Sequence, residues 1–260
     1  LKEKIAKFVP VEITYDEALL TDREKVVLEK LYRASKIIDE LFLEQVYIEN
    51  YQIKSDLISK TANKSILERE PELKPQLELF NIMFGPFDRL EDNKPFIGKN
   101  TKPLGANFYP VDMSKEEFEK WIKDNPADEK TFTSEFTIIR RDNGKLVAIP
   151  YSEYFKDKLT AASNLLKEAA EYSDNPSLKK YLLSRANAFL SNDYYQSDMD
   201  WMDLKDNNIE IVIGPYEVYE DAMFNYKAAF ESFVTIKDPV ETKKLEVFAK
   251  YLNEIEKNLP

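Results

Sequence analysis

Residues 209–236, IEIVIGPYEVYEDAMFNYKAAFESFVTI, indicate the sheet around which this chain of 260 residues is organised. Ile209–Ile213 has the residue types and alternation of a β-strand with one buried face. Tyr226–Ile236 has the same character and predicts a second strand. Gly214-Pro215 is expected to end the first strand. The stretch therefore predicts two strands joined by a turn rich in acidic and aromatic residues.

A second pair of strands is predicted upstream of this stretch. Thr133–Arg140 and Lys145–Ile149 are rich in β-formers, and Asp142-Asn143-Gly144 separates them. Asn-Gly between two such runs is the strongest short signal for a β-hairpin.

Helical periodicity dominates the rest of the chain. Thr21 and Glu24 form a capping box before a long apolar-periodic run, which predicts a helix from about residue 22 to about 48. An antiparallel helix pair is expected at about 152–172 and after Asn175-Pro176, and a last helix is expected to end at Asn258-Leu259-Pro260. The predicted fold class is α+β, predominantly helical, with a small antiparallel or mixed barrel-like sheet.

The chain is expected to form one lobe over residues 1–260. Its first part, 1–84, is helical. The segment 85–110 contains three of the five glycines and several prolines, and its aromatic residues predict an irregular loop that is packed down. Strands and helices fill 111–260.

Composition excludes several kinds of site. The chain has no histidine and no cysteine, so a Ser-His-Asp triad, a Cys-His pair and a Cys/His zinc site cannot be built from it. Asp and Glu outnumber Lys and Arg by 48 to 37, and a surface of this sign argues against nucleic acid and anionic lipid as partners. No apolar run approaches the roughly 20 residues of a membrane span. We expect a soluble protein of the bacterial cytoplasm or periplasm, and Leu1 in place of Met predicts a piece of a longer protein.

Three groups of residues are candidates for binding or chemistry. Glu217 follows the first predicted strand and Glu231 lies within the second, and paired carboxylates can act as acid and base or hold an ammonium group; a solvated or structural role is the simpler alternative. Asp193 lies in an acidic and aromatic patch suited to the amino terminus of a peptide, or to a polar loop with aromatic anchors. Asn107, with Tyr109 and Arg140, could engage a carboxylate.

The order of several motifs resembles the dipeptidyl peptidase III family of zinc peptidases, and its bacterial branch in particular. Residues 201–206 (WMDLKD), 214–221 (GPYEVYED) and 227–234 (KAAFESFV) match a W-x-x-x-K-D motif, a G-x-x-E-x-Y-x-D motif and a strand with F-E-x-F-V. Residues 85–90 (GPFDRL), 105–110 (GANFYP) and 139–141 (IRR) have counterparts as well. The resemblance covers about residues 80–260.

The resemblance implies one lobe of a two-lobed enzyme, with helices around a small β-barrel. It implies that the zinc motif, H-E-x-x-x-H or similar, lies on the other lobe, after Pro260. It implies a phenol at Tyr181 for the oxyanion, substrate binding at Asp193, and a cleft shaped by Glu217, Tyr219 and Asp221. Some bacterial relatives are labelled Nudix hydrolases, but the chain has no Nudix box of clustered Arg-Glu-x-x-Glu-Glu.

The expected function is therefore that of a non-catalytic, amino-terminal lobe of a zinc-dependent dipeptidyl peptidase. The partners expected are a peptide substrate and a catalytic lobe that follows in the chain; this chain is expected to hold no cofactor, and zinc belongs to the full-length protein. Two alternatives remain open: a stand-alone peptide-binding or scaffold module, and a metal-free hydrolase that uses Glu217 and Glu231.

Overall fold

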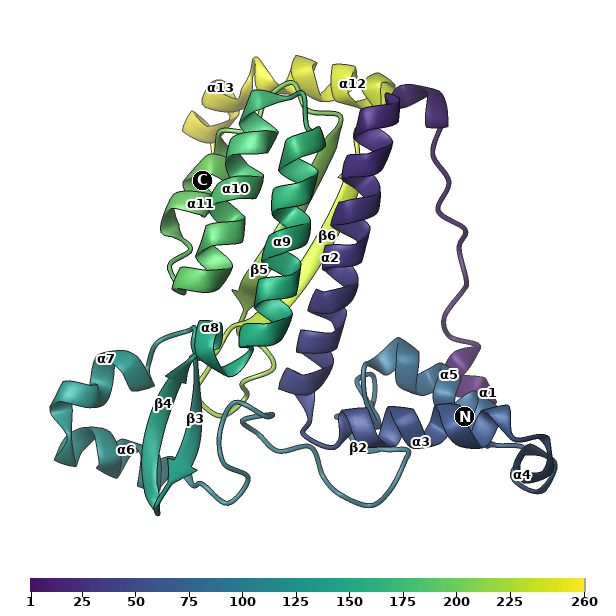
Figure 1. Ribbon diagram of the computed structural model, residues 1–260, viewed down its shortest axis with the longest axis vertical. Helices are drawn as coiled ribbons and strands as arrows, with labels where there is room; N and C mark the ends of the chain where they lie inside the picture. The colour runs from purple at the N-terminus through teal and green to yellow at the C-terminus, as the bar shows by residue number, and fades with distance from the viewer. Residues whose placement is uncertain (260) are drawn as a thin grey trace.

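A layer of long helices packed on a β-hairpin forms the body of the protein in the computed structural model, which describes residues 1–259. Helices α2 (Asp22–Val46), α9 (Lys156–Tyr172) and α10 (Pro176–Ser191) stand side by side, as Figure 1 shows. The hairpin of β5 (Ile209–Glu217) and β6 (Ala229–Ile236) lies across one side of this layer. The short helix α11 (Tyr195–Met202) follows α10 and packs on it.

The core forms where the hairpin meets the helices. Ile209, Ile211 and Ile213 of β5 are buried and belong to the same apolar cluster as Leu31, Ile38 and Leu41 of α2 and the inner faces of α9 and α10. The predicted long helix is confirmed. Its capping box is formed, because Thr21 N donates to Glu24 Oε2 at 2.8 Å and Glu24 N donates to Thr21 Oγ1 at 3.2 Å.

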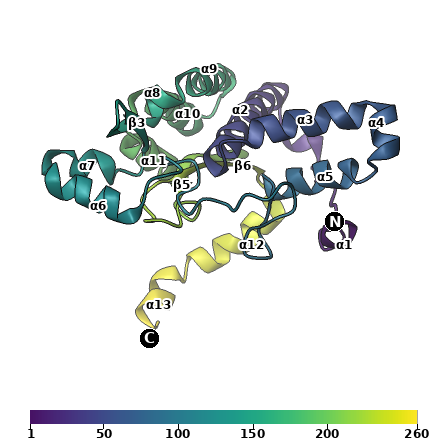
Figure 2. The ribbon, with the colours of Figure 1, turned by 90° about the horizontal axis from the view of Figure 1, so that it is seen from below.

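A second, smaller apolar cluster lies at the carboxyl end of α2. It joins α2 to α3 (Asn50–Ala62), α4 (Lys64–Arg69) and α5 (Leu73–Met83) through the buried side chains of Leu43, Leu57, Leu73 and Phe80. The amino-terminal helix α1 (Lys2–Ile5) lies against α5. Seen from below, α3, α4 and α5 lie on one side of the hairpin, and α6 (Lys115–Asp124) and α7 (Glu129–Phe132) lie on the other (Figure 2).

The strands form three separate two-stranded antiparallel sheets. They are β1 (Phe87–Asp88) with β2 (Lys94–Pro95), β3 (Thr137–Asp142) with β4 (Lys145–Pro150), and β5 with β6. The predominantly helical α+β class is thus confirmed. The sheet has a simpler form than the barrel that the resemblance implied, because no closed barrel occurs within residues 1–259.

Several predicted boundaries were wrong. The first hairpin starts at Thr137 instead of Thr133, because α7 ends at Phe132 and a turn follows it. The predicted helix at 152–172 is split into α8 (Tyr151–Tyr154) and α9. Strand β5 does not end at Gly214-Pro215 but continues to Glu217, and β6 starts at Ala229 instead of Tyr226.

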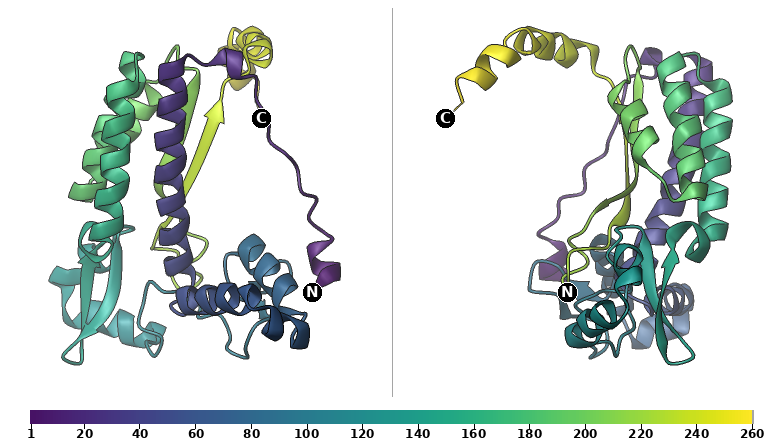
Figure 3. Two further views of the ribbon diagram at one scale, coloured as in Figure 1. Left: turned by 45° about the vertical axis from the view of Figure 1, so that its right-hand side comes forward. Right: turned by 90° about the vertical axis from the view of Figure 1, so that its left-hand side faces the viewer.

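The last predicted helix is divided into α12 (Pro239–Ala249) and α13 (Leu252–Lys257); Pro260, its predicted end, lies outside the described residues. These two helices project from the body, as the right-hand view of Figure 3 shows. Their apolar residues are exposed: Val240, Leu245, Val247, Phe248, Tyr251, Leu252, Ile255 and Leu259. Within residues 1–259, no helix combines the length and the apolar character that crossing a bilayer requires.

Candidate functional site

A bulge in β5 brings two glutamates to one face of the hairpin. Gly214 lies opposite Glu231 and Pro215 lies opposite Phe230, but the next pair is Glu217 with Ala229. Tyr216 is therefore an extra residue in β5. Because side chains alternate along a strand, Ala229 and Glu231 point to the same side, and Glu217 joins them there. We call Glu217 and Glu231 the acid pair.

The electrostatics of Glu231 show that the two carboxylates interact. Burial raises the pKa of Glu231, and the negative charge of Glu217 raises it further. Glu217 is exposed, whereas Glu231 is half-buried. Two neighbouring carboxylates, one of which is partly shielded from water, favour a cation between or beside them.

Aromatic side chains accompany the acid pair. Tyr219, two residues after the end of β5, is 78% exposed, and Phe233, two residues after Glu231 on the same face of β6, is 58% exposed. Exposed rings of this size beside a negative site suit a ligand with a positive charge and an apolar body.

The turn that follows Tyr219 is organised by Asp221, which has no exposed surface. Its carboxylate accepts hydrogen bonds from the hydroxyl of Tyr109 at 2.7 Å and from backbone N–H groups of the turn. These donors are Met223, Phe224, Tyr226 and Lys227, at 2.9–3.1 Å. Asp221, predicted as a cleft-shaping residue, thus has all its hydrogen bonds inside the protein and fixes the loop between β5 and β6.

Glu220 ties the same turn to the irregular segment 85–110. Its carboxylate is 8% exposed and forms ion pairs with Arg89 and Lys102. Burial raises the pKa of Glu220, but the charges of Arg89 and Lys102 outweigh burial and lower it overall. The turn that follows Tyr219 is therefore anchored at both Glu220 and Asp221, whereas the ring of Tyr219 is exposed.

The other three predicted residues lie apart from the acid pair. Asn107 is buried; its amide donates to Glu44 O at 2.8 Å and accepts from Arg140 Nη2 at 3.1 Å. Tyr181 is buried on the inner face of α10, and burial raises its pKa to about 12. Asp193 is exposed in the turn after α10, where its Oδ1 accepts from Tyr195 N at 3.2 Å.

Two buried cations were missed by reasoning from the sequence. Arg185 carries a charge but has no exposed surface. It lies on α10 among the buried residues Tyr181, Leu182 and Phe189. Its position four residues after Tyr181, on the apolar face of the helix, was the available signal. Lys227 is also fully buried; its Nζ donates to Phe132 O, Ser134 O and Thr137 Oγ1 at 2.6–2.8 Å.

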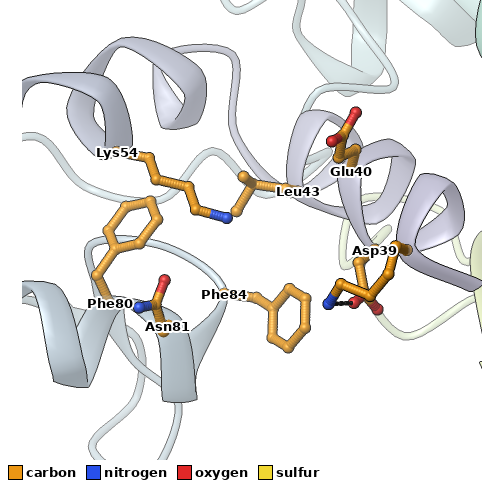
Figure 4. A pocket seen from close by; sticks show the side chains of 8 residues that line it. Asp39, Glu40, Leu43, Lys54, Phe80, Asn81 and Phe84 are labelled. Carbon is orange, nitrogen blue, oxygen red and sulfur yellow. Dashed lines mark hydrogen bonds and ion pairs between the residues drawn. The ribbon is translucent and has the colours of Figure 1, made fainter. Parts of the chain in front are cut away.

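One pocket adjoins Tyr219, and another lies at the carboxyl end of α2. One of about 310 Å³ adjoins Tyr219 and is lined by Lys94, Lys102, Leu104 and Glu220. Another, of about 240 Å³, lies between α2, α3 and α5. Figure 4 shows residues of its lining, among them Lys54, Glu40 and the rings of Phe80 and Phe84. Neither pocket is lined by Glu217 or Glu231.

The residues present do not fit a zinc ion. Within residues 1–259, no group of three or more His, Cys, Asp or Glu side chains is arranged to hold a metal. Zinc sites in proteins use three or four such ligands. The acid pair alone offers two carboxylates, which can hold an ammonium group or share a proton.

Comparisons with known proteins place this geometry in context. The sequence model described as peptidase family M49 matches residues 97–260. The structure of DPP III from Caldithrix abyssi is 62% identical with a TM-score of 0.93, over 100% of this chain and 48% of that one. The structure of dipeptidyl-peptidase III from Corallococcus sp. strain EGB is 43% identical with a TM-score of 0.89, over 100% of this chain and 47% of that one.

A curated plant protein matches as well. It is called Nudix hydrolase 3, from Arabidopsis thaliana, and is 34% identical over 310 residues, which take in 100% of this chain and 39% of the plant protein. This chain thus spans less than half the length of each of these three proteins.

Proposed function

Because this chain belongs to peptidase family M49, we propose that it forms one wall of the peptide-binding cleft of a zinc-dependent dipeptidyl peptidase. In this proposal the acid pair holds the amino terminus of the peptide, and the chain has no catalytic centre of its own. The metal and the residues that activate water belong to the rest of such an enzyme.

The single observation that carries the proposal is the meeting of Glu217 and Glu231 on one face of the hairpin. A peptide amino terminus is an ammonium group at neutral pH, since its pKa is about 8. Carboxylates that repel each other are stabilised when such a cation binds between them. The exposed rings of Tyr219 and Phe233 supply an apolar surface for the first side chains of the peptide.

Tyr219 is also the better candidate for a phenol that contacts substrate. The resemblance implied this role for Tyr181, but Tyr181 has no exposed surface, whereas Tyr219 is 78% exposed in the motif that carries Glu217. We therefore propose that Tyr181 has a structural role. Asn107 and Asp221 have structural roles for the same reason, because their polar atoms are engaged inside the protein. Asp193 remains a candidate for a second peptide contact.

The exposed apolar residues of α12 and α13 support a second lobe as the partner. Leu245 and Phe248 of α12 and Leu252 of α13 are each more than half exposed. Exposed apolar surface of this extent is typical of a face that another part of an assembly covers. The relatives are about twice as long as this chain, which supports the remainder of such a protein as the cover.

Calorimetric titration with tetra-alanine and with its N-acetylated form tests the role of the acid pair. We expect the free amine to bind at least about tenfold more tightly than the acetylated peptide. Glu217→Gln and Glu231→Gln should each remove that preference, and Glu210→Gln, on the same hairpin but away from the bulge, should retain it. Equal binding of the two peptides to the unaltered chain would overturn the proposal.

A second measurement separates the two alternatives. The chain should not hydrolyse a dipeptidyl naphthylamide or a nitrophenyl glycoside, with or without added zinc. Glycosidase turnover that Glu231→Gln abolishes would favour the carboxylate hydrolase instead. A stand-alone binding module would bind the free peptide with the same preference, but a reading frame that stops at Pro260 would distinguish it from a peptidase lobe.

A further inference from the structure

Arg185 stands in a cage of three aromatic rings on the other side of the bulge. Its guanidinium carbon lies 5.6 Å from the ring centre of Tyr181, 5.4 Å from that of Tyr194 and 5.5 Å from that of Tyr216. Tyr181 comes from α10, Tyr194 precedes α11, and Tyr216 is the extra residue of β5. We call this group the arginine cage.

Ring contacts, more than hydrogen bonds, determine where the guanidinium lies. Its Nη2 donates to the carboxylate of Asp198, but Nε and Nη1 have no hydrogen-bond partner among the described residues. A planar guanidinium packs well on aromatic faces, and the attraction between the charge and the rings is stronger when the group is buried. The cage therefore holds Arg185 between three different elements.

The guanidinium also touches the backbone of β5 at the bulge. A Cβ atom on Gly214 would lie 2.6 Å from Arg185 Nη1 and 3.3 Å from the ring of Tyr216. Gly214 is the residue opposite Glu231, and Tyr216 immediately precedes Glu217. Arg185 thus lies against β5 just before the register change, at Gly214, and at the extra residue itself, Tyr216.

We propose that Arg185 is a positioning residue: the arginine cage fixes the bulge in β5 and thereby keeps Glu217 on the same face as Glu231. A regular ladder would turn Glu217 to the opposite face, so the extra residue decides which face Glu217 takes. The inference deepens the proposed role of the acid pair and rests on it for its functional meaning, but its structural part stands independently of any peptide.

Carbon-13 NMR titration of the glutamate carboxyls tests the positioning. Arg185→Met should lower the pKa of Glu231 towards that of an isolated glutamate, because Glu217 moves away. The loss of a positive charge would by itself raise that pKa, so the direction of the shift identifies the cause. Arg185→Lys, which retains the charge but not the planar group, should lower the pKa too; it serves also if Arg185→Met does not fold.

The control and the double variant make the result specific. Arg23 also stacks on a tyrosine, Tyr172, at 5.5 Å and pairs with Asp174, but it lies at the start of α2; Arg23→Met should leave the pKa of Glu231 unchanged. In a Glu217→Gln background, Arg185→Met should have no further effect on that pKa. An unchanged pKa in folded Arg185→Met and Arg185→Lys, or a full effect in the Glu217→Gln background, would overturn the proposal.

Peptide binding then tells the two proposals apart. If the acid pair holds the peptide amine, Arg185→Lys should weaken binding of tetra-alanine by about tenfold and leave binding of the acetylated peptide unaltered. If the pKa of Glu231 falls but peptide binding does not change, the positioning is correct and the assignment of the amine site is wrong.

Discussion

Glu217 and Glu231 share one face of the β5–β6 hairpin only because Tyr216 is an extra residue between them in the ladder. One inserted residue therefore converts a side chain that would point to the helices into half of an acidic site. The charge of Glu217 reaches Glu231 and raises its pKa, which is the electrostatic sign of this proximity.

Removing the charge of Glu217 should change the pKa of Glu231. Glu217→Gln should lower the pKa of Glu231, because the repulsion disappears while burial remains. Carbon-13 carboxyl titration measures this directly. Glu210→Gln is the matched control in the same strand and should leave the pKa of Glu231 as it is. If the two variants gave the same titration curve for Glu231, the carboxylates would not be coupled.

A side chain at residue 214 should destabilise the fold by contact with Arg185. Gly214→Ala places a Cβ 2.6 Å from Arg185 Nη1, at a φ of +155°, and should lower the free energy of unfolding by about 2–4 kcal/mol. Gly98→Ala has a φ of +73° but no atom within 4 Å of its Cβ, so it should cost only about 1 kcal/mol. Urea unfolding of the two variants compares the costs, and equal values would exclude a tight contact at Gly214.

Lys227 should be important for stability rather than for binding. Lys227→Met would leave three oxygen acceptors, on Phe132, Ser134 and Thr137, without their buried donor. Burial lowers the pKa of Lys227 to about 7, so at pH 6 the ammonium is charged and donates all three bonds. We expect a loss of about 2–4 kcal/mol in urea unfolding at pH 6. The exposed Lys237→Met should cost less than about 0.5 kcal/mol, and a similarly small loss at Lys227 would contradict the assignment.

The contribution of Glu220 should depend on pH. Its pKa in the folded protein is lowered below the ordinary value of 4.5, so the unfolded chain takes up the proton first as the pH falls. Its ion pairs with Arg89 and Lys102 therefore contribute stability above about pH 4.5, and this contribution decreases as the pH falls through the folded pKa. The difference in unfolding free energy between the unaltered chain and Glu220→Gln should be larger at pH 6 than at pH 3.5. A difference that does not change with pH would show that Glu220 acts by shape alone.

Local signals predicted the elements that local interactions determine. The capping box at Thr21 starts α2 as expected, and Asn143-Gly144 lies in the turn between β3 and β4. Strand β5 was predicted too short because Gly214-Pro215 normally ends a strand, yet here Pro215 pairs with Phe230 and both are buried. The start of β6 was predicted too early because the backbone N–H groups of Tyr226 and Lys227 bind Asp221 instead of a strand.

The candidate site could be predicted only in part, because it too depends on contacts between residues far apart in the sequence. The motif around Glu217 and Tyr219 was visible in the sequence, and both side chains are exposed. That Glu231 joins Glu217 depends on a register shift; Gly214-Pro215 was interpreted as the end of a strand, although Gly and Pro inside a strand can also mark a bulge. The burial of Tyr181, Asn107 and Asp221 depends on partners more than 30 residues away or on tertiary packing, such as Tyr109 for Asp221.

The ion pairs of α1 close a ring of the polypeptide, which runs from Lys4 through α2 to the segment around Asp88. Lys4 forms ion pairs with Asp88 and with Glu91, the latter at 2.9 Å, while residues 9–16 run as an extended span back to the start of α2 (Figure 3). A single proteolytic cut in this exposed span would open the ring and leave α1 attached by non-covalent contacts alone, and none of its four residues is buried. Ion pairs at a surface contribute little to stability, so the short amino-terminal piece should separate from the nicked molecule on a sizing column without denaturant.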